Sequence, residues 1–190
     1  MKKSNTDTCC LTLPLKLEKW QEDRLAKRFE IARQIYNTMV HAELKKLRNI
    51  ENSQPYRQIQ KQIEALNWKN QNDKARLKSL YNDRNKLLNT IGFSEYGFKA
   101  DIKYYYKHFN DNIGSSVAVH GIAPQVWAAF EKMLFHKEGK KKDDIHSLHG
   151  YSVTGKSGGV EIIFRKTYIE WKGLKLPLNA LRTTHTKPKC

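Results

Sequence analysis

The sequence predicts an α+β fold in which a small β-barrel carries a long helical insertion. Three observations point to this class: a leucine-rich alternating run near the start, a long block with helical periodicity, and short glycine-punctuated apolar segments near the end. The simplest arrangement pairs the first strand with the last ones, so that the helices lie between them in sequence. We therefore expect barrel strands in residues 8–18 and 139–180, a helical insertion over 19–138 and a tail over 181–190.

The first strand is predicted within residues 8–18. Alternate positions from Leu11 to Leu17 are leucine, so four leucine side chains share one face, as in a half-buried strand. Pro14 lies inside this run and cannot donate a hydrogen bond to a neighbouring strand. We therefore expect this segment at a sheet edge or at a bulge.

Residues 19–50 are predicted to form one long helix. Apolar residues recur there at spacings of three and four, which is the period of a helix buried along one face. They are Leu25, Phe29, Ala32, Tyr36, Val40, Leu44 and Leu47. Arg33 and Asn37 flank one side of this apolar stripe, and Arg28 flanks the other.

A helical hairpin is predicted next, with helices over 55–69 and 73–91. Pro55 suits the first turn of a helix, where its missing N–H would have no partner. We expect Asn72 or Asp73 to cap the second helix, because short polar side chains accept hydrogen bonds from the free amide groups at a helix start.

Further helices follow a turn framed by Gly92 and Gly97. The segment from Lys103 to Phe109 interleaves aromatic with basic residues on a short helix. Such a pattern can stack bases while neutralising phosphate, or two of its rings belong to the core and one is exposed. The helix expected over 115–136 contains Pro124, which either kinks it or starts its second half.

After the lysine-rich run at 140–142 the pattern becomes that of short strands. Apolar and β-branched segments alternate there with glycines, which is typical of strands and tight turns. The predicted strands cover residues 147–154, 160–166, 168–171 and 174–178.

The chain is strongly basic, with 35 Lys and Arg against 19 Asp and Glu and a formal net charge of +16. A folded protein tolerates such one-sided charge when a polyanion neutralises it, which favours nucleic acid as the partner. No apolar run approaches the roughly 20 residues of a membrane-spanning helix, and the first residues do not resemble a secretory signal. We therefore expect a cytosolic protein that binds no membrane.

No cofactor, metal or catalytic centre is expected. The cysteines Cys9, Cys10 and Cys190 lack the spacing of a disulfide framework or a zinc site. His146 and His149 form an HxxH pair with no further ligand nearby, which is typical of ordinary surface imidazoles. No Ser/His/Asp, Cys/His or paired-carboxylate arrangement stands out, so the sequence does not predict an enzyme.

Gly150–Ser157 matches the phosphate-binding pattern G-x-x-x-x-G-K-[ST]. That motif requires a buried strand before it and a helix that begins at its Lys-Ser. Here the preceding residues 143–149 are polar, and the following segment 160–166 reads as a strand. We favour a glycine-rich β-hairpin whose Lys156 is available to a phosphate backbone, with a small P-loop NTPase as the alternative.

Three parts of the chain resemble a known family when taken in order. The first is residues 13–17 followed by 28–37, which end in R-x-x-Y-N; the second is 122–134, with its A-F pair; the third is 152–178. Together they resemble the N-terminal half of TnpB (OrfB-type) insertion-sequence proteins. These are RNA-guided nucleases associated with transposition and related to the type V CRISPR effectors.

This resemblance implies a wedge-type, oligonucleotide-fold-like barrel with a helical recognition insertion. Its expected partners are a guide-type RNA and double-stranded or unwound DNA, held through backbone and shape. The RuvC-type nuclease domain of the family follows the matched region, so we expect it to be absent from this chain. A truncated gene, one half of a split protein, an excised fragment and a stand-alone DNA-binding regulator that competes with a full-length relative all stay open.

The expected nucleic-acid-binding residues lie on the long helix and the predicted strands. Phosphate contacts are expected from Arg28, Arg33, Lys156, Arg165, Lys166, Lys172 and Lys175. Tyr36 and Asn37 are expected near the nucleic acid at the end of the motif helix, and Trp171 on the β-segment. Core packing is the alternative for Tyr36 and Trp171.

Overall fold

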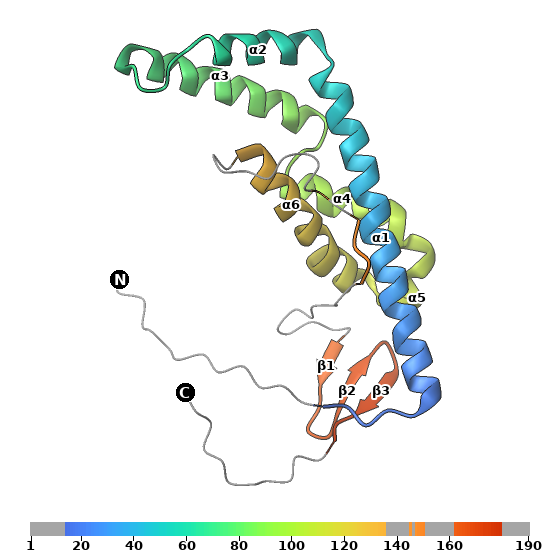
Figure 1. Cartoon of the computed structure of the whole chain (residues 1–190). Coiled ribbons are helices and arrows are strands. Elements are labelled where there is room, and N and C mark those ends of the chain that lie inside the picture. The colour runs from blue at the N-terminus through green and yellow to red at the C-terminus, as the bar shows by residue number, and fades with distance from the viewer. Residues whose placement is uncertain (1–13, 136–144, 146, 151–161, 180–190) are drawn as a thin grey trace, which may run out of the picture.

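The computed structural model describes residues 14–135, 145, 147–150 and 162–179 (Figure 1). Within them the α+β class is confirmed, because a mainly helical body carries one small antiparallel sheet. The helical elements are α1 (Lys19–Glu51), α2 (Gln54–Glu64), α3 (Gln71–Thr90), α4 (Glu95–Tyr106), the 3₁₀ turn η1 (Lys107–Phe109), α5 (Asn110–Ile113), the π-helical η2 (Val117–Ile122) and α6 (Ala123–Phe135). The strands are β1 (Ile162–Phe164), β2 (Tyr168–Trp171) and β3 (Leu174–Pro177).

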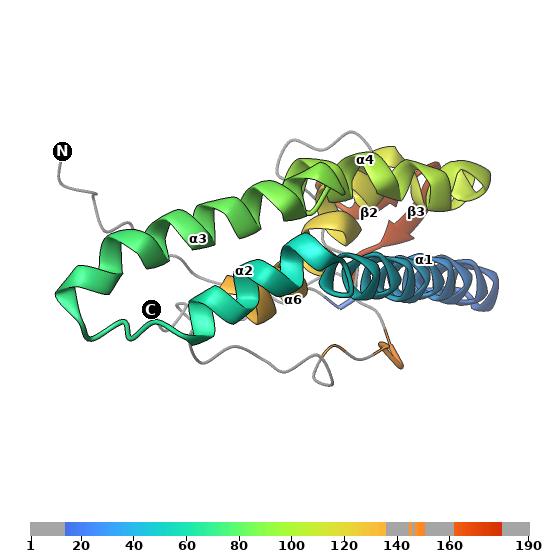
Figure 2. The same ribbon diagram turned by 90° about the horizontal axis from the view of Figure 1, so that it is seen from above.

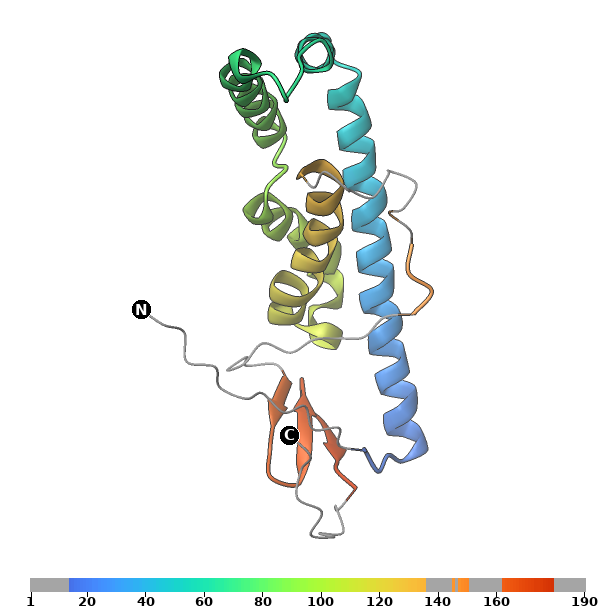
Figure 3. The same ribbon diagram turned by 60° about the vertical axis from the view of Figure 1, so that its left-hand side comes forward.

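Helix α1 runs the length of the described structure, as Figures 1 and 3 show. The sheet lies beside its N-terminal part, α4 and α6 lie along its middle, and the α2–α3 hairpin extends from its C-terminal end. The predicted apolar stripe lies on its buried face: Ala32, Tyr36, Val40 and Leu47 are buried, and Leu25, Phe29 and Leu44 are half-buried. Ile35 and Met39, at 3% and 0% exposure, widen that face beyond the prediction. A reciprocal capping box between Glu18 and Gln21 fixes its start.

The core lies where α1, α4 and α6 meet. Phe93 and Phe98 pack edge-to-face with ring centroids 5.4 Å apart, and Phe130 of α6 lies 5.6 and 5.4 Å from them. Trp127 adds a fourth ring, 5.2 Å from Phe98. Edge-to-face pairs of this kind are stabilising beyond the area that they bury, so this cluster joins α4 to α6.

A close backbone approach connects α3 to α4. Gly92 ends α3 with φ +79°, a left-handed conformation that glycine adopts without steric cost. Gly97, in the first turn of α4, is so close to it that an added Cβ would lie 1.9 Å from the Gly92 carbonyl oxygen. Ser94 caps α4 by accepting a hydrogen bond from the Gly97 N–H at 3.1 Å.

The predicted hairpin of α2 and α3 is confirmed, but its second cap is not where we expected it. Asn70, rather than Asn72 or Asp73, caps α3: its side chain accepts a hydrogen bond from the Asn72 N–H at 3.0 Å. Asp73 instead accepts from the N–H of Asn67 at 3.1 Å and so closes the connecting loop. Figure 2 shows the two helices side by side.

Two open alternatives in the middle of the chain are decided by the structure. Pro124 stands in the first turn of α6, so it starts that helix after the π-helical η2. In the tyrosine-rich segment, Tyr105 and Tyr106 pack against the core while Tyr104 is 80% exposed. Two rings are therefore associated with the core and one is free to meet solvent.

The sheet has the order β1-β2-β3, with Trp171 opposite Leu174 and Ile162. Lys172 and Gly173 join β2 to β3 with φ of +47° and +75°, the signature of a tight two-residue hairpin turn. Leu174 and Leu176 face the protein interior while Lys175 faces outward, the alternation of a half-buried strand.

The start of the described chain pairs with its end, as predicted. Leu15 forms an antiparallel bridge with Leu178, and the Lys16 N–H donates to the Pro177 carbonyl at 2.9 Å. The helices therefore lie in sequence between two paired β-segments. Within the described residues the sheet is open, so a closed barrel is not shown, and the expected strand over 147–154 is absent from its described part, Ser147–Gly150.

A buried ionic cluster connects α1 to α4. Glu43 is fully buried, and Lys46 donates to it at 2.9 Å and to Asp101 at 2.5 Å. Burial raises the pKa of Glu43, because an ionised carboxylate loses its hydration there. Burial also acts to lower the pKa of Lys46, but the two carboxylates outweigh it and the pKa lies above its ordinary value.

We expect Glu43→Gln to change how stability depends on pH. A carboxyl whose pKa is raised by folding binds more protons in the folded state, so its stabilising contribution falls as pH rises from about 4.5 through the raised pKa. Glutamine does not ionise, so the variant does not lose stability in this way. In urea unfolding, its free energy of unfolding relative to wild type should therefore increase as pH rises through this range.

Glu30→Gln is the control of opposite sign. The Arg33 hydrogen bond lowers the pKa of the exposed Glu30 to about 2, so its contribution is present above pH 4.5 and is lost as pH falls toward 2. Relative to wild type, Glu30→Gln should therefore lose stability as pH rises through that range. If the stabilities of the two variants relative to wild type changed with pH in the same direction, the pKa shifts assigned to Glu43 and Glu30 would be contradicted.

Candidate nucleic-acid interface

The sheet is joined to α1 by one arginine. Arg28 is 8% exposed, and its guanidinium donates to the carbonyl oxygens of Trp171 and, at 3.2 Å, Lys172. The same guanidinium lies over the Trp171 ring, 5.1 Å from its centroid. Burial and repulsion from Arg24 lower the pKa of Arg28. Arg28, an expected phosphate contact, therefore holds the β2–β3 turn against α1 in this structure.

Trp171 lies in the core, the alternative left open for it by the sequence. It is 2% exposed, its indole N–H donates to the Ile113 carbonyl at 3.1 Å, and its ring packs 6.0 Å from that of Phe29. It fixes the sheet to both α1 and α5. Tyr36 is also buried, at 7% exposure, and burial raises the pKa of its hydroxyl.

Arg33 and Asn37 hold a distant segment of the chain on α1. The Asn37 side chain donates to the Leu148 carbonyl at 3.1 Å and accepts from the Leu148 N–H at 2.8 Å. Arg33 donates to the same carbonyl at 3.2 Å and pairs with Glu30 at 2.5 Å. The structure thus brings Arg28, Arg33 and Asn37 to contacts with backbone groups of the C-terminal segments.

The remaining cations expected on the sheet lie on its outer face and in its turns. Arg165 and Lys166 belong to the β1–β2 turn and are exposed, and Arg165 lies 3.8 Å from Glu170. Lys175 is exposed on the outer face, with its ammonium 5.6 Å from the Tyr168 ring. Lys172 is half-buried in the β2–β3 turn. These four cations, which lie in the two turns at opposite ends of β2 and on β3, are together called here the sheet surface.

Lys156 and most of the glycine-rich motif lie outside the described residues. Its first residue, Gly150, is exposed, and the described residues before it, 145 and 147–149, form no strand. Instead, Leu148 is held on α1 by Asn37 and Arg33. The first strand described after the motif begins at Ile162. The described part of the approach to the motif therefore lacks the strand that a P-loop requires.

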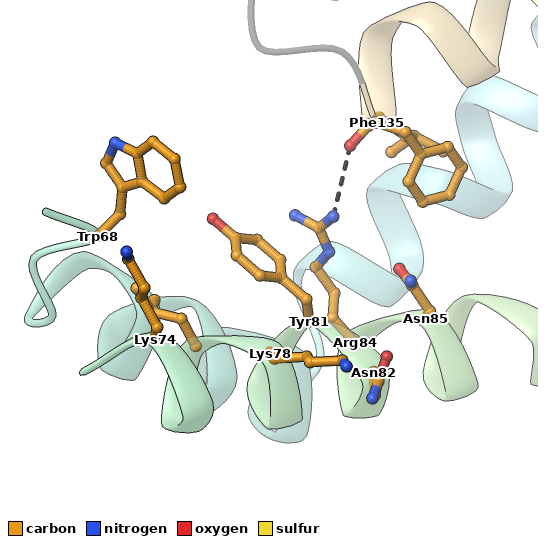
Figure 4. Close-up of a pocket in the computed structure, with 10 residues that line it drawn as sticks. Trp68, Lys74, Lys78, Tyr81, Asn82, Arg84, Asn85 and Phe135 are labelled. Atoms are coloured by element: carbon orange, nitrogen blue, oxygen red, sulfur yellow. Dashed lines mark hydrogen bonds between the residues drawn. The ribbon is translucent and has the colours of Figure 1, made fainter. Parts of the chain in front are cut away.

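A second basic surface lies between the hairpin and the end of α6 (Figure 4), and the sequence analysis did not single it out. It is a groove of about 620 Å³ with three rings on its walls, those of Trp68, Tyr81 and Phe135. Lys74, Lys78 and Arg84 stand beside them. The spacing Lys74, Lys78, Tyr81, which places side chains on one face of a helix, is the signal that could have found it.

The described residues include neither a metal-binding cluster nor a membrane-spanning helix. Among them, no group of three or more His, Cys, Asp or Glu side chains is placed to hold a metal ion. No helix in the described part of the chain is both long and apolar enough to cross a membrane. Comparison with protein-family models, with curated proteins and with solved structures finds no match to this chain.

Proposed function

We propose that this chain is a nucleic-acid-binding module, the RNA- and DNA-binding part of a TnpB-like RNA-guided nuclease. The observation that carries the proposal is the combination of a net charge of +16 with a folded body that displays cations on two separate surfaces. A basic tail would attract polyanions equally well, but a folded body offers a fixed spacing of cations along a nucleic-acid backbone. The sheet surface and the hairpin groove supply that spacing.

The distribution of charge along the chain supports the proposal. Residues 54–90, which form the hairpin, contain eight Lys and Arg against three Asp and Glu. The described sheet region, 162–179, contains four Lys and Arg against a single Glu. The hairpin and the sheet, which adjoin the two ends of α1, therefore each have an excess of positive charge. They lie at opposite ends of the described structure (Figure 3).

Two residues of the motif behind the TnpB-like resemblance join distant parts of the chain. Arg33 and Asn37 belong to the R-x-x-Y-N pattern, and both hold the segment at Leu148, more than 100 residues away in sequence. Tyr36 of the same pattern lies in the core. The pattern thus couples the helical insertion to the C-terminal segments, as expected of a module in which strands and helices act as one body.

We expect neutralisation of the sheet surface to lower the affinity for nucleic acid and to make that affinity depend less on salt. The triple variant Arg165→Gln, Lys166→Gln, Lys175→Gln removes three phosphate contacts. Each contact contributes about 0.7 to 0.9 to the slope of log affinity against log salt, so the slope should become shallower by about two. The measurement is the fluorescence anisotropy of a labelled RNA hairpin between 50 and 200 mM KCl, the range over which such a slope is resolved.

A matched control removes the same charge where carboxylates already surround it. Lys19 lies near Glu22 and Asp23, Lys86 pairs with Asp83, and Lys99 pairs with Glu95. Changing these three lysines to Gln should alter the slope by less than the sheet variant does. Equal changes in slope would show that net charge alone drives binding, and absence of binding by the wild type would refute the proposal.

A further inference from the structure

The groove between the hairpin and α6 has a composition that the sheet surface lacks. Its rings are accessible although they are large: Trp68 is 59% exposed, and Tyr81 and Phe135 are each 42% exposed. Figure 4 shows Trp68 and Tyr81 on the same side of α3, with Arg84 next to Tyr81 and turned toward the end of α6. Exposed rings on one wall offer successive stacking platforms for bases.

Cations accompany these rings at close range. The Lys74 ammonium lies 5.9 Å from the centroid of Trp68, and the Arg84 guanidinium lies 5.0 Å from that of Tyr81. Arg84 also donates to the Leu134 carbonyl at 3.4 Å, which orients it across the groove. Each cation lies over one face of its ring, so a base stacked on the opposite face would have a phosphate-binding cation across the ring.

The groove continues past Arg84 into a second hollow of about 550 Å³. Arg84 and Leu134 line both hollows, and the second adds Tyr56, Arg57 and Lys61. Among the described lining residues of the two, five are cations and Glu51 is the acidic one. The two hollows together form a basic track that follows the hairpin. Such a track suits a polyanion and disfavours a cationic protein segment.

Hydrogen-bonding groups lie on the walls of the track and in the buried packing beneath them. Within the described structure, Arg84 Nε and Asn85 Oδ1 are buried and have no hydrogen-bond partner. Asn82 and Gln60 add carboxamides to the walls. A carboxamide both donates and accepts, as does a ribose 2′-hydroxyl, which DNA lacks.

We propose that this track binds an unpaired segment of RNA, with bases stacked on Trp68 and Tyr81 and phosphates at Lys74, Lys78 and Arg84. The proposal rests on the proposed nucleic-acid-binding function and assigns one surface to unpaired RNA. A paired duplex does not suit the groove, because its bases are already stacked on one another and cannot reach the rings.

The test compares ring removal inside and outside the groove. Trp68→Ala with Tyr81→Ala should weaken binding of a labelled 12-nucleotide oligouridine RNA by at least tenfold, because loss of each stacking ring weakens binding by about fivefold or more. The control is Tyr96→Ala with Trp20→Ala: these rings are 83% and 50% exposed, and Lys99 and Arg24 lie over them as Lys74 lies over Trp68. The control variant should bind like wild type.

Two further probes separate the possible failures. An RNA hairpin should bind the groove variant with nearly wild-type affinity, and an oligodeoxyuridine of equal length should bind wild type more weakly than the RNA. If the protein binds the RNA hairpin but the ring variants do not change its affinity for oligouridine, the groove proposal alone is overturned. Equal binding of the two single strands would overturn its restriction to RNA, and binding to none of the probes would overturn the proposed function as well.

Discussion

Arg28→Ala should lower the free energy of unfolding by about 3 kcal/mol and detach the sheet from α1. Hydrogen bonds from a charged donor contribute about 1.5 to 3 kcal/mol each, and a desolvated cation–π contact contributes about 2 kcal/mol. Arg28 makes two such hydrogen bonds and one such contact, all with the β2–β3 turn. Once Arg28 is removed, water can hydrate the Lys172 carbonyl, because that residue is only half-buried. This hydration offsets part of the summed hydrogen-bond and cation–π contributions.

Urea unfolding and hydrogen exchange give separate readings of this effect. Amides of residues 168–177 should exchange faster in the variant, while those in the middle of α1 should keep their protection, because the core of α1, α4 and α6 does not involve Arg28. Arg28→Lys should recover only part of the loss, since an ammonium lacks the planar fork that reaches two carbonyls.

Arg24→Ala, one turn earlier on α1, is the matched control. Its guanidinium lies 5.6 Å from the ring of Trp20, which is 50% exposed, so its contact with the ring is largely hydrated. An exposed contact of this kind contributes about 0.5 to 1 kcal/mol. If Arg28→Ala costs no more than Arg24→Ala, or if the whole chain rather than the sheet loses protection, the role given to Arg28 is wrong.

Gly97→Ala should destabilise the protein by about 2 kcal/mol or more, although alanine is the better helix former. In an unobstructed helix interior, this substitution would stabilise by about 1 kcal/mol. Here the new Cβ would lie 1.9 Å from the Gly92 carbonyl oxygen, so the junction of α3 and α4 must move apart. Overpacking a tight site costs about 1 to 3 kcal/mol, and the Phe93 and Phe98 rings on either side transmit the shift to the core.

Gly173→Ala separates a steric cause from a conformational one. Gly173 has φ +75°, but an added Cβ would meet nothing within 4 Å. Its replacement should therefore cost only the strain of a left-handed alanine, about 1 to 2 kcal/mol. The two substitutions should also affect different parts of the protein. Gly97→Ala should make thermal unfolding less cooperative because it disturbs the α3–α4 junction, whereas Gly173→Ala should loosen the sheet alone. A stabilised Gly97→Ala variant would contradict the packing described.

Local pattern was sufficient to predict α1 and the α2–α3 hairpin, but it placed Gly97 in a turn where the structure has the first turn of α4. The apolar spacing of α1, the position of Pro55 and the polar connection between α2 and α3 depend on near neighbours in sequence, and all three agree with the structure. The pairing of Leu15 with Leu178 also followed from the order of strands and helices. Cap choice was less certain, because Asn70 and Asp73 both suit a helix start and only the loop geometry decides between them.

The roles of individual site residues could not be predicted in the same way. Arg28 flanks the apolar stripe of a surface helix, where an arginine is usually hydrated, and its partners are carbonyls 143 and 144 residues away. Backbone carbonyls carry no sequence signal, so nothing in the chain marks them as acceptors. Asn37 and Leu148 present the same difficulty at a separation of 111 residues. In the hairpin groove, the ring and cation spacing was present, but the opposite wall comes from α6.

The most direct test of the central claim is the affinity of the wild-type chain for a structured RNA at 50 and 200 mM salt. A module that places six to ten cations on phosphates loses about a thousandfold or more in affinity over that range. We expect tight binding at the lower concentration and a loss of this size at the higher one. No binding to structured RNA, or an affinity that is the same at both salt concentrations, would contradict the account.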